Sequence, residues 1–278
     1  MPLASTGSIV AAARSRGGGA AAFNVIGLEH AEGLVAGAEA AGAPLILAIS
    51  ENCVRYHGRL APIALASLDL AARAAVPIAI HLDHVEDAAL VDEGLALGIR
   101  SVMFDASKLP YEENLAATRE VAARCHAVGA WLEAELGEVG GKDGVHAPGA
   151  RTDPAEAAAF VAATGVDALA VAVGTSHAMT TRDTALDLAL IGRLRAAVPV
   201  PLVLHGSSGV PDDELGRAIE AGMTKINVST HLNHVFTDAI RGWLEANPTK
   251  VDPRGYLKAG RQALAAETAR LLGVLRAG

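Results

Sequence analysis

Short apolar segments alternate along the chain with longer stretches in which apolar residues recur at helical spacing. The short segments are rich in Val, Ile, Leu and Ala, and a Gly or Pro usually precedes the next one. They predict eight buried strands, at 21–26, 44–50, 77–83, 101–105, 131–136, 168–173, 201–205 and 225–229. Strand alternating with helix predicts a parallel sheet, and eight strands close such a sheet. The pattern therefore predicts an α/β protein built as a (β/α)8 TIM barrel.

The expected helix boundaries agree with this architecture. Thr152, Asp153 and Pro154 provide a capping residue and a proline suited to a first helical turn. Glycines stand where helices are expected to stop, at Gly98, Gly129, Gly165 and Gly222. A further helical run, 257–272, follows the eighth unit and is expected to pack against the barrel or another subunit. The structural alternative is a doubly wound open sheet, which the missing Gly-x-Gly-x-x-Gly turn after the first strand disfavours.

Composition narrows the class of protein. The 278 residues are 51% hydrophobic, enough for one domain over 1–278. Aromatic residues make up 3%, the net charge is −8 and no Lys/Arg run occurs, so neither nucleic acid nor an anionic membrane is an expected partner. With no basic leader and no long apolar run, the chain is expected to be cytoplasmic. Cys53 and Cys125 form no Cys-x-x-Cys pair and are expected to be ordinary buried thiols.

Polar residues collect where the predicted strands end, which is the active-site end of a barrel. They are Asn24, Ser50, Asp83, His84, Asp105, Glu133, Glu135, His177, His205 and Asn227. His84, His177 and His205 follow the third, sixth and seventh strands. Three imidazoles with a fourth position left for water or substrate are typical of a catalytic zinc site. His81 is expected to be structural or to support a ligand from behind.

Two further segments suggest an anion site and a lid. Gly206-Ser207-Ser208-Gly209 and Asn227-Val228-Ser229-Thr230 follow strands seven and eight, where barrels often bind phosphate. The polar, Gly-rich stretch 135–151 is too long for a simple connection. It is expected to be either a lid that carries a catalytic group or a disordered surface loop.

A metal with an open position, a carboxylate and a phosphate pocket suit the formation of an enediolate from a phosphorylated ketose. Asp83 and His84 are neighbours in an extended strand, so their side chains are expected to point oppositely, Asp83 to the substrate and His84 to the metal. Schiff-base chemistry would need a desolvated lysine. None of the five lysines is expected to be one, Lys225 included.

Several ordered motifs together resemble the class II, zinc-dependent ketose-bisphosphate aldolases, in particular their fructose- and tagatose-bisphosphate branch. They are Ala22-Phe23-Asn24, His81-Leu82-Asp83-His84, Glu133-Ala134-Glu135-Leu136-Gly137, Val173-Gly174-Thr175-Ser176-His177, Leu204-His205-Gly206-Ser207-Ser208-Gly209, Lys225-Ile226-Asn227-Val228 and Asp252-Pro253-Arg254. The resemblance implies reversible aldol cleavage of fructose or tagatose 1,6-bisphosphate. The products would be dihydroxyacetone phosphate and an aldehyde such as glyceraldehyde 3-phosphate, formed through a zinc-stabilised enediolate.

The resemblance also assigns roles. It implies that His84, His177 and His205 bind the catalytic Zn2+, and that Asp83 transfers the proton of the C4 hydroxyl. Asp105 and Glu135 match a second position for a divalent or monovalent cation in some members. The expected substrate contacts are Asn24, Ser50, Gly206, Ser207, Ser208, Asn227, Val228, Ser229 and Thr230. Arg254 matches an arginine that reaches the neighbouring subunit's substrate phosphate, which implies a homodimer or homotetramer.

Two departures from the family pattern concern the substrate more than the reaction. The lid glutamate of relatives aligns with Asp143, which is one methylene shorter, and the glycine after the sixth-strand histidine is Ala178. Two alternatives remain at this point. One is a zinc hydrolase on the same barrel, and the other is a non-catalytic subunit that supports a related aldolase.

Overall fold

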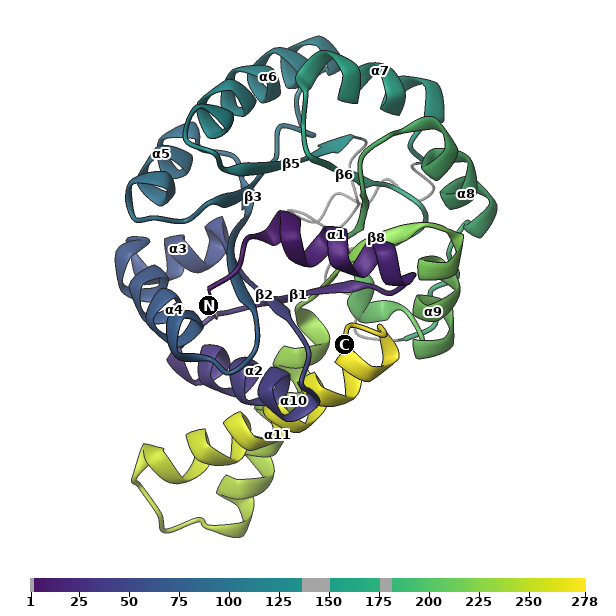
Figure 1. Ribbon diagram of the computed structural model, residues 1–278. Coiled ribbons are helices and arrows are strands. Elements are labelled where there is room, and N and C mark those ends of the chain that lie inside the picture. Colours follow the sequence, from purple (N-terminus) through teal and green to yellow (C-terminus); the bar gives the residue numbers. More distant parts are fainter. Residues whose placement is uncertain (1–2, 137–150, 176–181) are drawn as a thin grey trace.

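The computed structural model describes residues 3–136, 151–175 and 182–278. Its strands form a closed, all-parallel barrel in the order β1 to β8, with β8 pairing back to β1 through Ala22 and Asn227 (Figure 1). The strands are β1 (Ala20–Asn24), β2 (Leu45–Ser50), β3 (Ile78–Val85), β4 (Ser101–Phe104), β5 (Trp131–Leu136), β6 (Ala168–Val171), β7 (Leu202–Leu204) and β8 (Met223–Val228). The predicted barrel is confirmed, and closure excludes the open doubly wound sheet.

Helices surround the barrel and follow the strands in the predicted alternation. They are α1 (Thr6–Arg16), α2 (Leu28–Ala41), α3 (Glu51–His57), α4 (Ala61–Arg73), α5 (Ala88–Ala96), α6 (Tyr111–Ala127), α7 (Pro154–Thr164), α8 (Leu188–Ala197), α9 (Asp212–Ala221), α10 (Thr230–Ala246) and α11 (Pro253–Val274), with a short 3-10 turn η1 (Ser207–Gly209). The expected cap at Asp153 is present, since its carboxylate accepts hydrogen bonds from the N–H groups of Ala155 and Glu156. The run expected at 257–272 lies within α11.

The barrel interior is unusual in carrying small and polar side chains. Ala20, Ala22 and Ala79 contact α1, which lies across the amino end of the barrel (Figure 1). Small alanines leave room for longer neighbours, and the fully buried side chains include those of Glu133 and Lys225. Such barrels are normally filled with branched apolar residues. The polar filling therefore needs an explanation, which the site provides.

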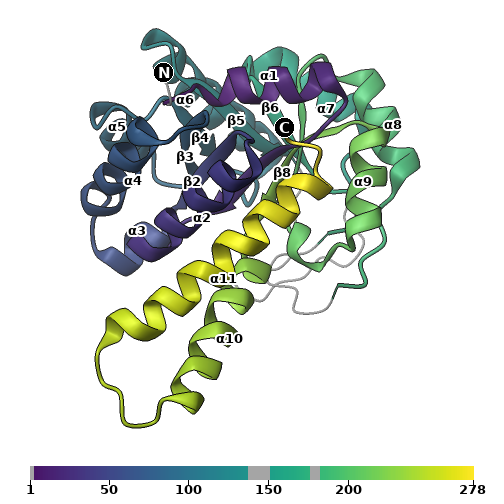
Figure 2. The same cartoon turned by 60° about the horizontal axis from the view of Figure 1, so that its bottom comes forward.

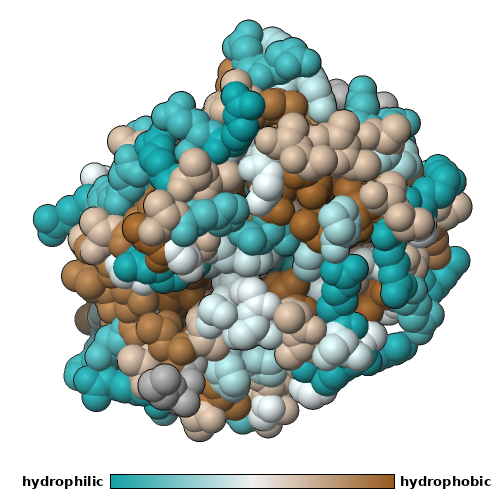
Figure 3. All heavy atoms as spheres, turned by 45° about the horizontal axis from the view of Figure 1, so that its top comes forward, coloured by the Kyte–Doolittle hydropathy of each residue, from teal (hydrophilic) through white to brown (hydrophobic). Residues whose placement is uncertain are grey.

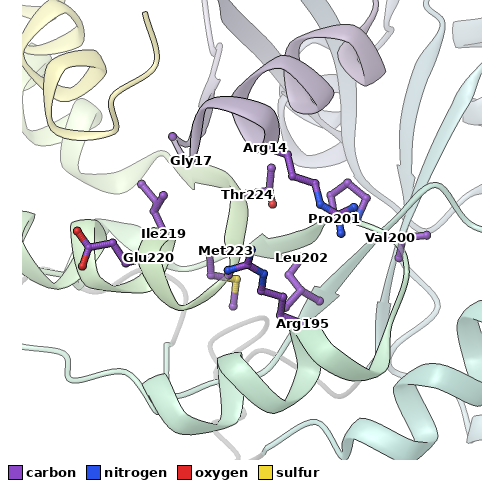
Figure 4. A pocket seen from close by; sticks show the side chains of 12 residues that line it. Arg14, Gly17, Arg195, Val200, Pro201, Leu202, Ile219, Glu220, Met223 and Thr224 are labelled. Atoms are coloured by element: carbon purple, nitrogen blue, oxygen red, sulfur yellow. The ribbon is translucent and has the colours of Figure 1, made fainter.

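The amino end of the barrel also contains a hollow of about 240 Å³ (Figure 4). Two of its charged groups are engaged locally: Arg14 donates to the Pro199 carbonyl at 3.1 Å, and Glu220 pairs with Arg276 at 2.9 Å. The strands begin at this end, away from the polar strand ends. In barrels this end serves stability.

The hairpin of α10 and α11 stands out from the barrel (Figure 2). Leu232 is the buried residue of α10, whereas α11 packs closely on α2. A Cβ atom added at Gly37 of α2 would lie 2.5 Å from Thr268 Cβ of α11, so this approach requires a glycine. The hairpin is thus fixed at its base and projects a long arm.

The two cysteines agree with the expectation drawn from the sequence. Among the described residues, no helix combines the length and apolar character needed to cross a membrane. Polar and apolar side chains are interspersed on the face shown in Figure 3. Cys53 and Cys125 are free and buried, and burial raises the pKa of each thiol to about 11. Both are therefore poorly reactive.

Candidate active site

The carboxyl end of β3 carries a local distortion that shapes the site. His84 has a φ of 49°, in the left-handed region that a non-glycine residue rarely adopts. The pairing of β3 with β4 shifts its register between Leu82 and Val85 at the same point. As a result, ligand atoms of Asp83, His84 and His205 lie within 4.8 Å of one another. The expectation that Asp83 and His84 point oppositely is therefore wrong, because the distortion interrupts the alternation of the strand.

His84 and His205 face each other, and in each ring the second nitrogen contacts a carboxylate. His84 Nε2 lies 3.0 Å from His205 Nδ1. The other ring nitrogens reach carboxylates, His84 Nδ1 to Asp105 Oδ2 at 2.8 Å and His205 Nε2 to Glu133 Oε1 at 2.9 Å. A carboxylate can accept a hydrogen bond only from a protonated nitrogen, so in the neutral rings the two facing nitrogens carry lone pairs.

This arrangement fits a metal ion. Two facing lone pairs repel unless a proton or a cation lies between them, and imidazole backed by a carboxylate is a common metal ligand. Two nitrogens that share a tetrahedral Zn2+ at about 2.0–2.1 Å stand roughly 3.3 Å apart, close to the 3.0 Å observed. His84 also belongs to a second group of donors, with Asp105 and Glu135. The predicted third ligand, His177, lies outside the described residues.

Asp83 is buried beside the two histidines, with both carboxylate oxygens held. Its Oδ2 accepts from Asn24 Nδ2 at 2.9 Å, and its Oδ1 accepts from Asn227 Nδ2 at 3.2 Å. Burial by itself would raise the pKa of this carboxyl, but His84, His205 and Lys225 outweigh burial and hold the pKa well below its usual range. Asp83 is therefore ionised at neutral pH and has a fixed orientation.

Asp105 and Glu135 are joined through a serine. Ser107 Oγ donates to Asp105 Oδ1 at 2.7 Å and lies 3.3 Å from Glu135 Oε1. Asp105 therefore contacts His84 Nδ1 with its Oδ2, while its Oδ1 contacts Ser107, which also lies near Glu135. Ser107 was not among the site residues predicted from the sequence.

The two segments expected to bind phosphate come together at one side of the barrel mouth. Gly206 has a φ of 68° and leads into η1, where Ser207 and Ser208 are buried. Ser208 Oγ accepts a hydrogen bond from the Ser229 N–H at 3.3 Å, next to the amino terminus of α10. Ser50 lies beside Asp83 in the sheet and accepts a hydrogen bond from the Cys53 N–H, which caps α3.

Lys225 is desolvated, although no desolvated nucleophile was expected among the lysines. Its side chain has no exposed surface, and its Nζ lies 2.8 Å from Glu133 Oε2 and donates to Asn227 Oδ1 at 2.8 Å. Side chains two residues apart on a strand share a face, so Lys225 points into the barrel with Asn227, as Glu133 does with Glu135. This parity could have identified both residues from the sequence.

His81 lies in the same interior layer. Its Nδ1 is 2.6 Å from Ser101 Oγ, and its Nε2 is 4.0 Å from Glu133 Oε2. Burial, reinforced by Lys225, lowers the pKa of His81 to about 3, so its ring is neutral. His81 therefore belongs to the packing beneath the site.

The remaining predicted residues lie elsewhere. Arg254 is 89% exposed at the start of α11, where it pairs with Asp252, the residue that caps the helix. Asp143, Ala178 and most of the expected lid lie outside the described residues.

The chain is similar to known aldolases in sequence and in structure. The family model described as "Fructose-bisphosphate aldolase class-II" matches residues 4–278. A relative from Klebsiella oxytoca named "D-tagatose-1,6-bisphosphate aldolase subunit GatY" is 41% identical over 247 residues, which cover 87% of each chain. The crystal structure of the YdjI aldolase from Escherichia coli K12 superposes with a TM-score of 0.84 at 30% identity, covering 99% of this chain and 98% of that one. A putative fructose-1,6-bisphosphate aldolase from Coccidioides immitis gives a TM-score of 0.86 at 28% identity, with coverages of 97% and 95%.

Proposed function

Since the chain belongs to the class II fructose-bisphosphate aldolase family, we propose that it cleaves a ketose 1,6-bisphosphate reversibly into dihydroxyacetone phosphate and an aldehyde such as glyceraldehyde 3-phosphate. The enzyme is a lyase of the class II type, whose members depend on a metal. The observation that carries the proposal is the pair of facing histidine nitrogens beside a fixed, ionised Asp83.

His84 and His205 would hold the metal, which we infer to be Zn2+, together with His177. When bound, the metal polarises the substrate carbonyl. Asp105 and Glu133 would orient the two histidines, and Asp105 with Glu135 would provide the second cation position. The two nitrogen donors from histidine support zinc, because imidazole suits this ion better than it suits Mg2+ or Ca2+.

Asp83 would take the proton of the C4 hydroxyl as the C3–C4 bond breaks, and return it in the condensation direction. The amides of Asn24 and Asn227 hold its two oxygens, so the carboxylate needs little reorganisation before it accepts the proton. Asp143 would transfer the proton to and from the nucleophilic carbon of the dihydroxyacetone phosphate half. The segments 206–208 and 227–230 would hold the phosphate of the dihydroxyacetone phosphate half, where N–H groups and small side chains favour an anion.

The substrate is tested by measuring dihydroxyacetone phosphate release from fructose and tagatose 1,6-bisphosphates in a coupled assay. We expect release that a chelator abolishes and added Zn2+ restores, because the metal carries the polarisation of the carbonyl. The tagatose sugar should be the better one if the chain follows the named activity of its Klebsiella relative. Release that persists in chelator, from protein shown to be free of metal, would contradict the proposal.

The name of that relative includes the word subunit, which supports a second candidate, a non-catalytic subunit of a related aldolase. The two candidates differ in a single measurement. Saturable zinc binding without turnover of either sugar would favour the supporting subunit.

The exposed position of Arg254 on the projecting arm supports a homodimer or homotetramer in which this residue reaches the partner's substrate phosphate (Figure 2). Mixing Arg254→Ala protein with Asp83→Ala protein tests this idea. A hybrid dimer would combine an intact Asp83 with an intact Arg254 in one of its two sites. We expect activity to rise on subunit exchange, to about one quarter of the wild-type level for random pairing into dimers. No rise, despite demonstrated exchange, would place Arg254 in its own subunit's site or outside the reaction.

A further inference from the structure

Lys225 is a buried cation that contacts two residues, Glu133 and Asn227. Its side chain is fully enclosed within the barrel, with Nζ 2.8 Å from Glu133 Oε2 and 2.8 Å from Asn227 Oδ1. Burying an ammonium group is costly unless it is paired and hydrogen-bonded. An apolar side chain would fill the barrel without this cost, so the position of the charge requires a reason.

Through Glu133, Lys225 is connected to His205. Glu133 meets Lys225 with Oε2 and accepts from His205 Nε2 with Oε1 at 2.9 Å. Because Lys225 occupies one oxygen, the carboxylate is fixed in the plane that presents the other oxygen to the imidazole. The proton of the neutral ring then stays on Nε2, and the Nδ1 lone pair faces His84.

Through Asn227, Lys225 is connected to Asp83. A side-chain amide can turn over and exchange its oxygen and its nitrogen at nearly the same shape. Lys225 can only donate, so it requires the oxygen of Asn227 on its side, which leaves Asn227 Nδ2 to donate to Asp83 Oδ1 at 3.2 Å. Without the ammonium group, only the 3.2 Å contact with Asp83 would favour that amide orientation.

We propose that Lys225 is a positioning residue that orients both halves of the candidate active site, His205 through Glu133 and Asp83 through Asn227. The proposal rests on the proposed function for its consequence on turnover, but its structural part concerns the metal-free protein. Lys225 itself stays away from the substrate, because its ammonium group is enclosed and already bound to two partners. One buried side chain thus links the metal-ligand set to the proton-transfer group.

The test compares Lys225→Met, which keeps the length and removes the charge, with wild type and with Lys108→Met, which removes a half-buried lysine paired with Glu86. The primary measurement is the 15N NMR signature of His205 in metal-free protein. We expect His205 Nε2 to be fully protonated in wild type and Lys108→Met, and only partly protonated in Lys225→Met, where the ring can also adopt the other tautomer. Zinc affinity, measured by competition with a chelator, should fall about 10- to 100-fold in Lys225→Met. The kcat of Lys225→Met should fall about 100-fold, and its KM should stay within a few-fold of the wild-type value. The reason is that the variant misplaces His205 and Asp83 but leaves the substrate contacts in place.

Lys225→Met leaves Glu133 as an unpaired buried charge and can fail to fold for that reason alone. The double variant Lys225→Met/Glu133→Met removes both charges and keeps the measurement possible. It should show the same mixed tautomer and weakened zinc binding. A single Nε2–H tautomer with wild-type zinc affinity in either variant would overturn the proposal. A tautomer shift in a protein that cleaves neither sugar would uphold the positioning role and reject the proposed function instead.

Discussion

Replacing His205 by Ala is expected to remove the bound metal and to lower turnover by about 10³-fold or more. His205 provides one of the two facing nitrogens, so its loss leaves the ion with an incomplete set of ligands. A metal contributes several kcal/mol of transition-state stabilisation, and each 1.36 kcal/mol corresponds to a factor of ten in rate. Metal content by atomic absorption and dihydroxyacetone phosphate release by coupled assay provide the two measurements.

The matched control for this variant is His126→Ala. His126 lies in α6 and forms a partly exposed pair with Asp167 at 3.0 Å, away from the strand ends. Its replacement should leave both metal content and turnover near wild type. If His205→Ala kept its metal and its activity, the assignment of the site would be wrong.

Replacing Asp83 by Ala is expected to preserve the metal while lowering kcat about 10²- to 10⁴-fold, the usual contribution of a positioned acid–base group. The pKa of this carboxyl lies well below its usual range, because the effects of His84, His205 and Lys225 outweigh its burial. The group is therefore already deprotonated at neutral pH, so the loss should be similar across the neutral range. Steady-state kinetics at several pH values, with metal analysis of the same samples, provide the test.

Asp69→Ala is a suitable control, since Asp69 is an exposed residue of α4 that pairs only with Arg73 among its described contacts. Near-normal turnover of Asp83→Ala would refute a role in proton transfer. Loss of the metal together with turnover would identify Asp83 as a ligand instead, an arrangement that its proximity to His84 and His205 makes geometrically accessible.

The fold was predictable because its signals are local. Each strand is a short apolar run, each helix has its own spacing and its own caps, and both patterns are set by residues near one another in the chain. The predicted strands at 131–136 and 44–50, for example, match β5 and β2 to within a residue. The structure also brings together Asp83, His84 and His205, as expected from their positions at strand ends.

The prediction for Asp83 and His84 was wrong because β3 departs from regular strand geometry at this point. Strict alternation would place Asp83 and His84 on opposite faces, but the left-handed backbone at His84 and the shifted pairing of β3 with β4 turn them toward the same place. A sequence pattern assumes regular backbone, so it does not indicate such a distortion. The burial of Lys225 was missed for a different reason. Strand parity indicates that its side chain points into the barrel, whereas its pairing with Glu133, on a strand distant in the sequence, exists only in the closed barrel.

Strand periodicity and helix capping act over a few residues, so the barrel, its strand ends and the residue types gathered there follow from the sequence pattern. The folded barrel is needed to know which nitrogen of each histidine faces its neighbour, which carboxylate contacts which ring and which side chain joins Glu133 to Asn227. These choices depend on hydrogen bonds between residues as far apart as Glu133 and His205 or Asn24 and Asp83, whose directions are fixed only when the barrel closes.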